Sequence, residues 1–394
     1  MSISRLRPSP LLMVNLSAFF SFGFVHMVAL ATPMWGSHLG LSAALIGLAA
    51  SCRSASPFVY AIHIGSLLDI VGVRRVLIFF SLQCALLPLL YPLLPSDVPF
   101  LVLQIFLGLA CAMAWIAAQT AVARTAGGDA QKTAWFSFFA SVGAVIGPLA
   151  LGGVWAWLGA DRGYGFLALW GAGLLASSLA LSKRAGIVRP RLKAAHFVPR
   201  LGIYRQAIAS LKQPVIAFVM ACAFVRLGAV AIVESFMPLL VQDRGFSPAV
   251  IGTLFALGNL VASPSSLLTS QWLRICGTAR RALLMSVAVS AASLVAVPFV
   301  SGLAPLGLAM IGYGFGIGIG MPVTLTLLSQ NVDADQQGMT AGMRATANRL
   351  GALVVPIMVG LLAELSGVAT AFWTSGLILL LTLFVTGVTL GRRS

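Results

Sequence analysis

Long, uninterrupted apolar segments constrain this chain more than any other feature. The segment Leu377–Leu390 contains no charged residue, and similar segments recur along the 394 residues. Only 9% of the residues are charged, whereas a soluble domain carries about a quarter. Lipid must therefore be the main solvent, where backbone polar groups have to bond internally, in helices or in a closed barrel. The apolar segments are too continuous for the alternating strands of a barrel, so we predict an all-α membrane protein.

Twelve transmembrane helices are expected when the chain is divided at its proline, glycine and charged clusters. Each segment holds the roughly 20 residues that a helix needs to cross a bilayer. The expected ranges are 11–35, 44–67, 76–94, 100–122, 134–158, 164–182, 214–241, 249–272, 282–301, 305–328, 344–363 and 369–390. The first range is longer than the apolar core of a signal peptide, so we interpret it as a retained helix.

The basic residues predict how these helices are oriented. The net charge is +16, but the basic residues lie between apolar segments and form no single patch, which argues against a nucleic-acid partner. With both termini in the cytoplasm, 21 of the 25 Lys and Arg, Arg349 among them, fall in cytoplasmic segments. Only Arg162 and Arg244 fall on the opposite side. This asymmetry predicts a multi-pass protein of the cell inner (plasma) membrane with cytoplasmic termini.

The two halves of the chain repeat each other, chiefly in glycine and proline. At a shift of 205 positions Gly40 falls on Gly245, Gly47 on Gly252 and Gly72 on Gly277; at 208, Gly143 falls on Gly351, Pro148 on Pro356, Gly152 on Gly360 and Gly159 on Gly367. Parallel repeats of this kind place a substrate site between two halves that rock about it. We therefore expect an N-terminal six-helix bundle (1–182), a basic cytoplasmic linker (183–213) and a C-terminal six-helix bundle (214–394).

A loop after the second expected helix has a distinctive pattern. It contains Gly65, Asp69, Gly72, Arg74 and Arg75, and it resembles the signature loop of the major facilitator superfamily, roughly G-x-L-x-D-R-x-G-R-R. The sequence departs from that pattern at one position, where isoleucine replaces a basic residue. The resemblance implies the superfamily's fold, two pseudo-symmetric six-helix bundles, and secondary transport by alternating access.

We interpret this loop as a conformational latch that holds the two halves together on one face. A nearby helix start or an arginine would stabilise the charge of Asp69, and Arg344, in the expected eleventh helix, is the candidate counterpart. The alternative is a turn that only sets the topology.

A second motif, Gly143, Gly147, Pro148 and Gly152, resembles the superfamily's antiporter-type helix-packing motif with one extra residue before the final glycines. Its small residues permit close helix packing. Within the superfamily the motif favours export. Gln104 stands where many proton-coupled members carry arginine.

Four ionisable residues inside the expected helices are candidates for the transport pathway, because such residues are costly in lipid and usually functional. Arg53 and Arg226 could grip an anionic substrate group with paired hydrogen bonds. Alternatively, Glu234 neutralises one arginine and closes a gate or stabilises packing. His26 and Glu234 are also candidates for proton coupling, and a packed, neutral His26 is the other interpretation. Asn259 is a candidate for polar lining of the pathway.

The function that we predict is secondary transport, with export of a small anionic or amphipathic organic compound. The alternative is a proton-coupled importer of an organic anion; a membrane-embedded enzyme or a sensor is a remote third possibility. We expect a monomer in the lipid bilayer that takes a small-molecule substrate, with protons as a candidate coupling ion. The five cysteines are scattered, and no cofactor or metal site is indicated.

Overall fold

The computed structural model describes residues 9–60, 68, 71–127, 129–181, 212–331 and 337–390, with the backbone alone for 10, 130, 329, 331 and 337–346. All regular elements in these residues are helices, as the sequence predicts. The first half contains α1 (Pro10–His38), α2 (Ala43–Tyr60), α4 (Val73–Leu86), η1 (Leu87–Leu89), α5 (Leu90–Leu93), α6 (Asp97–Ala126), α7 (Ala130–Leu158) and α8 (Ala160–Ala180). The second half contains α10 (Pro214–Asp243), α11 (Pro248–Ser265), η3 (Ser266–Leu268), α12 (Thr269–Cys276), α13 (Ala279–Ala296), η4 (Val297–Phe299), α14 (Leu303–Asn331), α15 (Gln337–Ser366) and α16 (Val368–Thr389).

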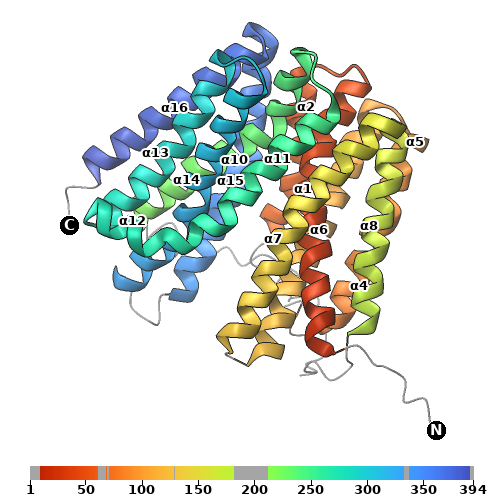
Figure 1. Cartoon of the computed structure of the whole chain (residues 1–394), viewed down its shortest axis with the longest axis horizontal. Helices are drawn as coiled ribbons and strands as arrows, with labels where there is room; N and C mark the ends of the chain where they lie inside the picture. The colour runs from red at the N-terminus through yellow and green to blue at the C-terminus, as the bar shows by residue number, and fades with distance from the viewer. Residues whose placement is uncertain are drawn as a thin grey trace.

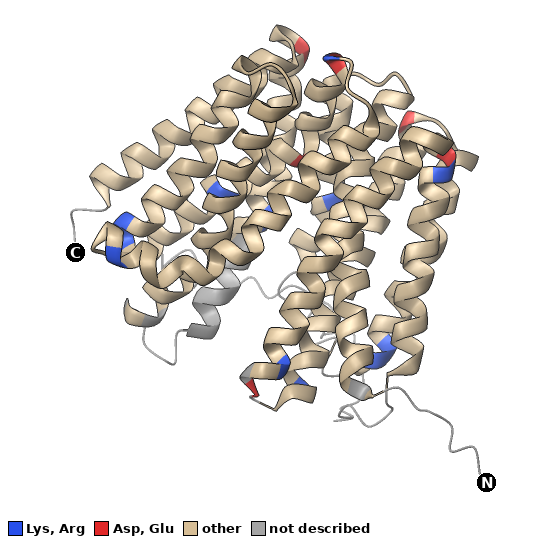
Figure 2. Cartoon of the chain, viewed as in Figure 1, with Lys and Arg blue, Asp and Glu red and all other residues tan. Residues whose placement is uncertain are grey.

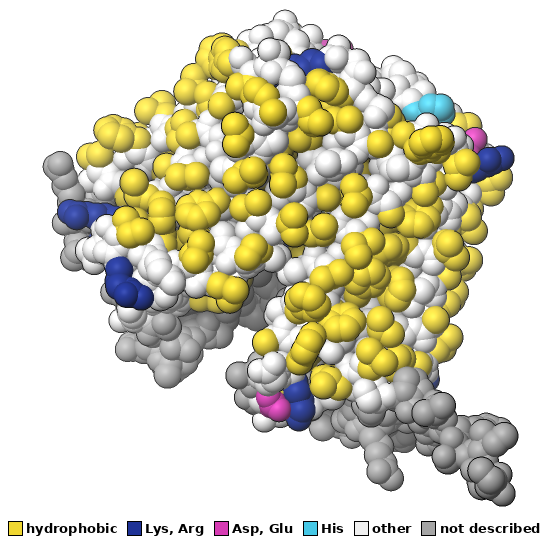
Figure 3. Space-filling model, in the orientation of Figure 1, with side chains coloured by type: hydrophobic (Ala, Val, Ile, Leu, Met, Phe, Trp, Pro, Cys, Tyr) yellow, Lys and Arg dark blue, Asp and Glu magenta, His cyan; other side chains and the backbone are white. Residues whose placement is uncertain are grey.

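Eleven of the described helical segments are long and apolar enough to cross a membrane. The remaining expected span, 44–67, begins with α2, and its continuation, 61–67, lies outside the described residues. Large apolar side chains such as Trp157, Leu365 and Ile275 are strongly exposed, and apolar side chains are spread over the visible side of both bundles (Figure 3). Such a surface fits a lipid environment and would be unfavourable in water.

The helices form two bundles, one from each half of the chain (Figure 1). Three pairs of helices make most of the contact between the bundles: α1 with α10, α2 with α15, and α7 with α11; α2 also touches α10. In the repeat, α2 of the first half is equivalent to α11 of the second, and α7 to α15. The α2–α15 and α7–α11 pairs are therefore related by the pseudo-symmetry of the two halves. Helix α1 begins and helix α16 ends on one side of the molecule, which we call the terminal face (Figure 1). On that side the molecular surface is notched between the bundles, whereas it is continuous on the opposite face (Figure 3).

Charge divides between the two faces. Most of the described acidic residues lie at the opposite face, and basic residues dominate the helix ends at the terminal face (Figure 2). The expected linker 183–213 lies outside the described residues except for Lys212 and Gln213. The asymmetry that the sequence predicts is therefore visible in the helix ends alone.

Glycines matched by the repeat end equivalent helices. Gly72 and Gly277 precede α4 and α13 with φ of 92° and 77°, and Gly159 and Gly367 precede α8 and α16 with φ of 86° and 84°. Side chains are rarely tolerated at these positive φ values. Both halves therefore keep glycine where the chain must turn back into the membrane.

Matched glycines also close the opposite face. Gly47 of α2 lies against Pro356 and Gly360 of α15, and Gly152 of α7 lies against Gly252 of α11. The repeat maps Gly47 onto Gly252 and Gly360 onto Gly152, so the two crossings are symmetry-related. Small residues allow the helix backbones to touch there. These two crossings hold the bundles together on the opposite face.

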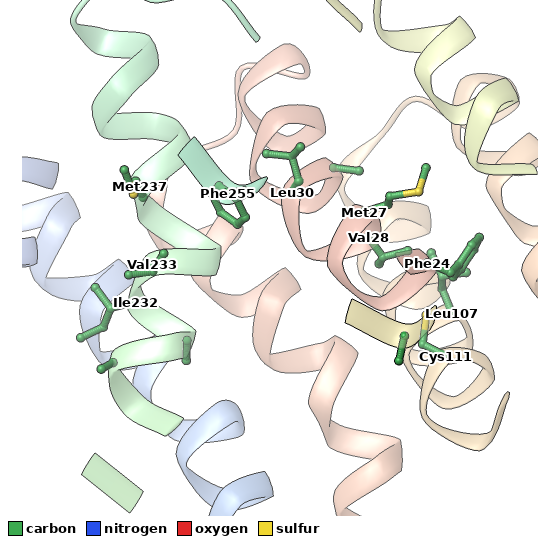
Figure 4. Close-up of a cluster of buried hydrophobic side chains, with 14 of the residues drawn as sticks. Phe24, Met27, Val28, Leu30, Leu107, Cys111, Ile232, Val233, Met237 and Phe255 are labelled. Carbon is green, nitrogen blue, oxygen red and sulfur yellow. The ribbon is translucent and has the colours of Figure 1, made fainter. Parts of the chain in front are cut away.

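Apolar side chains fill the contact between α1 and α10 toward the same face. Leu30 of α1 and Val233 and Met237 of α10 are almost fully buried. Phe255 of α11 lies between the two helices (Figure 4). This packing leaves few polar groups at the centre of the molecule, so those that remain stand out.

Candidate functional site

An ion pair joins the two bundles at the centre of the molecule. Arg53 Nη2 of α2 donates to Glu234 Oε2 of α10 at 2.7 Å. The two side chains are 16% and 17% exposed. A Cβ at Gly108 of α6 would overlap the backbone carbonyl of Arg53, so α6 holds this part of α2 in place. Of the partners considered for Glu234, the structure selects the arginine of the other half.

His26 lies beside this pair. It lines a cavity of about 70 Å³ together with Glu234, Asn259 and Tyr313, and it lies within electrostatic range of both Glu234 and Arg53. The cavity has room for about two water molecules. Asn259 Nδ2 of α11 also donates to the carbonyl of Ala144 in α7 at 3.1 Å. Asn259 therefore borders the cavity and ties the two halves together.

Arg226 occupies a different position from Arg53. It lies two helical turns from Glu234 along α10, and its stem packs near Gly320 of α14. Both Arg226 and Glu234 lie within electrostatic range of Tyr313. The grip of Arg53 and Arg226 on one substrate group stays a prediction.

Arg349 is a central residue that sequence reasoning missed. The sequence predicts a helix that begins at 344 and places Arg349 in a cytoplasmic segment, whereas α15 begins at Gln337. Arg349 consequently lies in the fourth turn, half-buried and within electrostatic range of Arg53. The continuous helix-compatible sequence from 337, without proline or an acidic residue, is the signal that could have placed it.

Aromatic side chains continue from His26 toward the terminal face. Phe22 meets His26 edge to face with ring centroids 4.7 Å apart, and it stacks on Trp115 of α6 at 4.4 Å. Trp115 in turn stacks on Phe136 of α7 at 5.8 Å. We call Phe22, Trp115 and Phe136 the aromatic row. It forms one side of the interior in the first half.

The predicted latch is only partly within the described residues. Gly65 and Asp69 lie outside them, and the side chain of Arg344, a residue of α15, is likewise not described. Arg74 donates from Nε to the Leu181 carbonyl and from Nη2 to the Leu179 carbonyl, both at 2.8 Å. These bonds satisfy carbonyls that the end of α8 would otherwise leave unpaired. Arg74 thus joins α4 to α8 within the first half.

Replacing Arg74 by Ala is expected to lower the free energy of unfolding by about 1–2 kcal/mol, because two charge-assisted hydrogen bonds are lost. Arg75 is exposed and supplies the matched control, since Arg75→Ala removes the same charge at the adjacent position. Thermal melts of the purified variants measure the difference. Equal melting temperatures for the two variants would contradict the assignment.

The expected helix-packing motif makes contacts in both directions. Gly143 and Gly147 pack against α1 at Phe19, Gly23 and Met27, and the Pro148 carbonyl and Gly152 face Gly252 across the halves. Gln104 is fully buried in the first half and accepts a hydrogen bond from Thr32 at 3.3 Å. The motif therefore fastens α7 to its own bundle and to the other one.

In the described part of the chain, no three His, Cys, Asp or Glu side chains lie close enough together to hold a metal ion. What the geometry offers is two bundles that meet at one face, part at the other and share an ion pair at mid-depth. The sequence matches the family profile described as Major Facilitator Superfamily over residues 14–356 and again over 219–394. The chain belongs to the major facilitator superfamily. The second match fits the internal repeat, since the second half alone aligns with the profile.

Solved structures of superfamily members share this fold. The nucleoside transporter NupG superposes with a TM-score of 0.80 at 14% identity, covering 98% of this chain and all of that one. A bacterial homolog to the human lysosomal transporter Spinster, in an inward-facing and unoccupied conformation, gives 0.73 at 14% identity over 99% and 97% of the two chains. No curated protein sequence matches the chain significantly. The superfamily fold indicates a transporter.

Proposed function

We propose that this chain is a secondary transporter that exports a small anionic or amphipathic organic compound across the cell inner membrane by alternating access. The observation that carries the proposal is the Arg53–Glu234 pair, which joins the two bundles at 2.7 Å. Arginine charge exceeds acidic charge around this pair, because Arg349 lies within electrostatic range of Arg53. Such an excess favours an anionic substrate.

The terminal face is the cytoplasmic face in this proposal, because positive charge marks the cytoplasmic side. The conformation is then open to the cytoplasm and closed by the glycine crossings at the other face. A monoanion that leaves a cell with an inside-negative potential gains about 2.3 kcal/mol per 100 mV. Export therefore needs no additional proton relay, in agreement with glutamine at position 104.

Proton-coupled import is the competing function, and a specific observation supports it: His26 and Glu234, two titratable groups, line one cavity. Vesicles with the purified chain and an imposed pH gradient separate the two. Export predicts that labelled organic anions leave along an inside-negative potential without a pH gradient. Accumulation driven by an inward proton gradient, and lost when the gradient is collapsed, would favour import. No movement of any anion beyond protein-free vesicles would contradict both.

A further inference from the structure

We propose that the substrate is an aromatic carboxylate, whose carboxylate binds between Arg53 and Arg349 and whose ring packs on Trp115 and Phe22. This inference deepens the proposed function and rests on it. It assigns the anionic group to one arginine from each half, and it names Arg349 in place of Arg226 as the partner of Arg53.

The helix crossing of α2 and α15 brings the two arginines to the same depth. The helices are antiparallel and touch where Gly47 meets Pro356. Arg53 follows Gly47 by six residues, and Arg349 precedes Pro356 by seven. At 1.5 Å per residue, both lie roughly 9–11 Å from the crossing toward the terminal face. The two arginines thus lie at a similar depth, on the terminal-face side of this crossing.

The two arginines differ in their partners. Arg53 donates to Glu234, whereas Arg349 makes no hydrogen bond or ion pair within the part of the chain that the structure describes. A partly buried, uncompensated guanidinium is costly, and bidentate binding of a carboxylate would satisfy it. Glu234 already shows that a carboxylate fits against Arg53. A substrate carboxylate is the same chemical group and would compete with Glu234 for this arginine.

The aromatic row adjoins this charged centre. Arg349 lies within electrostatic range of Cys111 on α6, and Trp115 follows Cys111 by one helical turn toward the terminal face. Phe22 likewise lies one helical turn from His26 on α1, toward the terminal face, and it stacks on Trp115. Both rings are half-buried, so part of their surface can receive a ligand. A flat ring attached to the carboxylate would rest against this surface by stacking.

The pseudo-symmetry of the fold supports a specific ligand orientation. The repeat pairs Arg53 with Gly258 and Arg349 with Ser141, so the second copy of the crossing, between α7 and α11, carries neither arginine. The proposed anion site is consequently present only at the α2–α15 crossing and has no symmetry-related copy at the α7–α11 crossing. A carboxylate bound there points its remaining atoms toward α1 and α6, where Phe22 and Trp115 lie.

Calorimetric titration of the purified chain at neutral pH tests the proposal, with benzoate as the probe, benzamide as its neutral isostere and hexanoate as a carboxylate without a ring. Benzoate is expected to bind, benzamide to bind at least about tenfold more weakly, and Arg349→Ala to weaken benzoate by about 10- to 100-fold. Arg349→Lys should recover part of that loss, because the charge remains but the bidentate geometry does not. Trp115→Leu should weaken benzoate by about fivefold or more and leave hexanoate unchanged.

Arg281→Ala is the control, since it removes an exposed arginine far from the site along the chain and should bind benzoate as the original protein does. Circular dichroism establishes whether each variant is folded. If Arg349→Ala does not fold, Arg349→Lys still tests the role of Arg349. Benzoate affinity that is unchanged in both Arg349 variants, or equal to benzamide affinity, would overturn the inference. If hexanoate binds in an Arg53-dependent way but benzoate does not, the inference fails and the proposed anion transport stands. If no carboxylate binds, the proposed function fails as well.

Discussion

Replacing Gly152 by Val is expected to shift the chain away from the conformation described here and to slow transport at least about tenfold. A Cβ at this position would lie 2.7 Å from the Pro248 carbonyl oxygen and 3.0 Å from the Gly252 Cα. Both are backbone atoms that cannot rotate away, so α7 and α11 must separate. Overpacking of this kind costs about 1–3 kcal/mol, which changes a two-state equilibrium about 5- to 150-fold. The opposite face should therefore open more often.

The adjacent glycine provides the control. A Cβ at Gly153 would meet nothing within 4 Å, so Gly153→Val adds the same side chain without the clash. Opening is measured with a single cysteine at Ala44, in the α2–α15 crossing, in a background without the five native cysteines. Gly152→Val should speed the labelling of this cysteine by an impermeant maleimide, and Gly153→Val should not. Equal labelling rates would show that the glycine crossings do not govern closure.

Neutralising one partner of the central ion pair is expected to damage the protein more than neutralising both. Glu234→Gln leaves Arg53 without its carboxylate, and Arg53→Gln leaves the carboxylate of Glu234 without its guanidinium. Each single variant should melt about 2–6 °C lower, and the double variant should lose less than the sum. The coupling free energy from this cycle is expected to be about 1–3 kcal/mol.

An exposed ion pair supplies the comparison for that cycle. Lys132 and Asp129 lie 3.2 Å apart, but their side chains are 44% and 41% exposed. Lys132→Gln should leave the melting temperature unchanged, because water already solvates both charges. Additive effects of Arg53→Gln and Glu234→Gln would mean that the contact between the halves contributes nothing beyond the two separate residues.

Local sequence was sufficient to predict the helices. Continuous apolar segments, few charges and punctuation by glycine and proline act over about 20 residues, which is the length scale of one span. The repeat was equally visible, because glycines such as Gly159 and Gly367 serve backbone geometry that no other residue supplies. Errors arose at helix ends, where little distinguishes a helical turn from a polar loop. The start of α15 at Gln337 is the clearest case, because the later predicted start placed Arg349 at the helix end and not inside the helix.

The candidate site was predicted only as a set of residues. His26, Arg53, Arg226, Glu234 and Asn259 were recognised because polar groups inside apolar segments are costly. Which of them meet could not be derived, since Arg53 and Glu234 are separated by 181 positions along the chain. The bond of Asn259 to Ala144 likewise depends on how α11 crosses α7.

The sequence by itself determined the solvent, the helical class and the duplicated architecture, because each depends on the composition and spacing of neighbouring residues. Only the tertiary structure decided that Glu234 pairs with Arg53, that Arg349 joins them at the same depth and that matched glycines become partners across the halves. Those contacts depend on where two antiparallel helices cross and on which face is closed. Both are properties of the packed bundles, and no local segment encodes them.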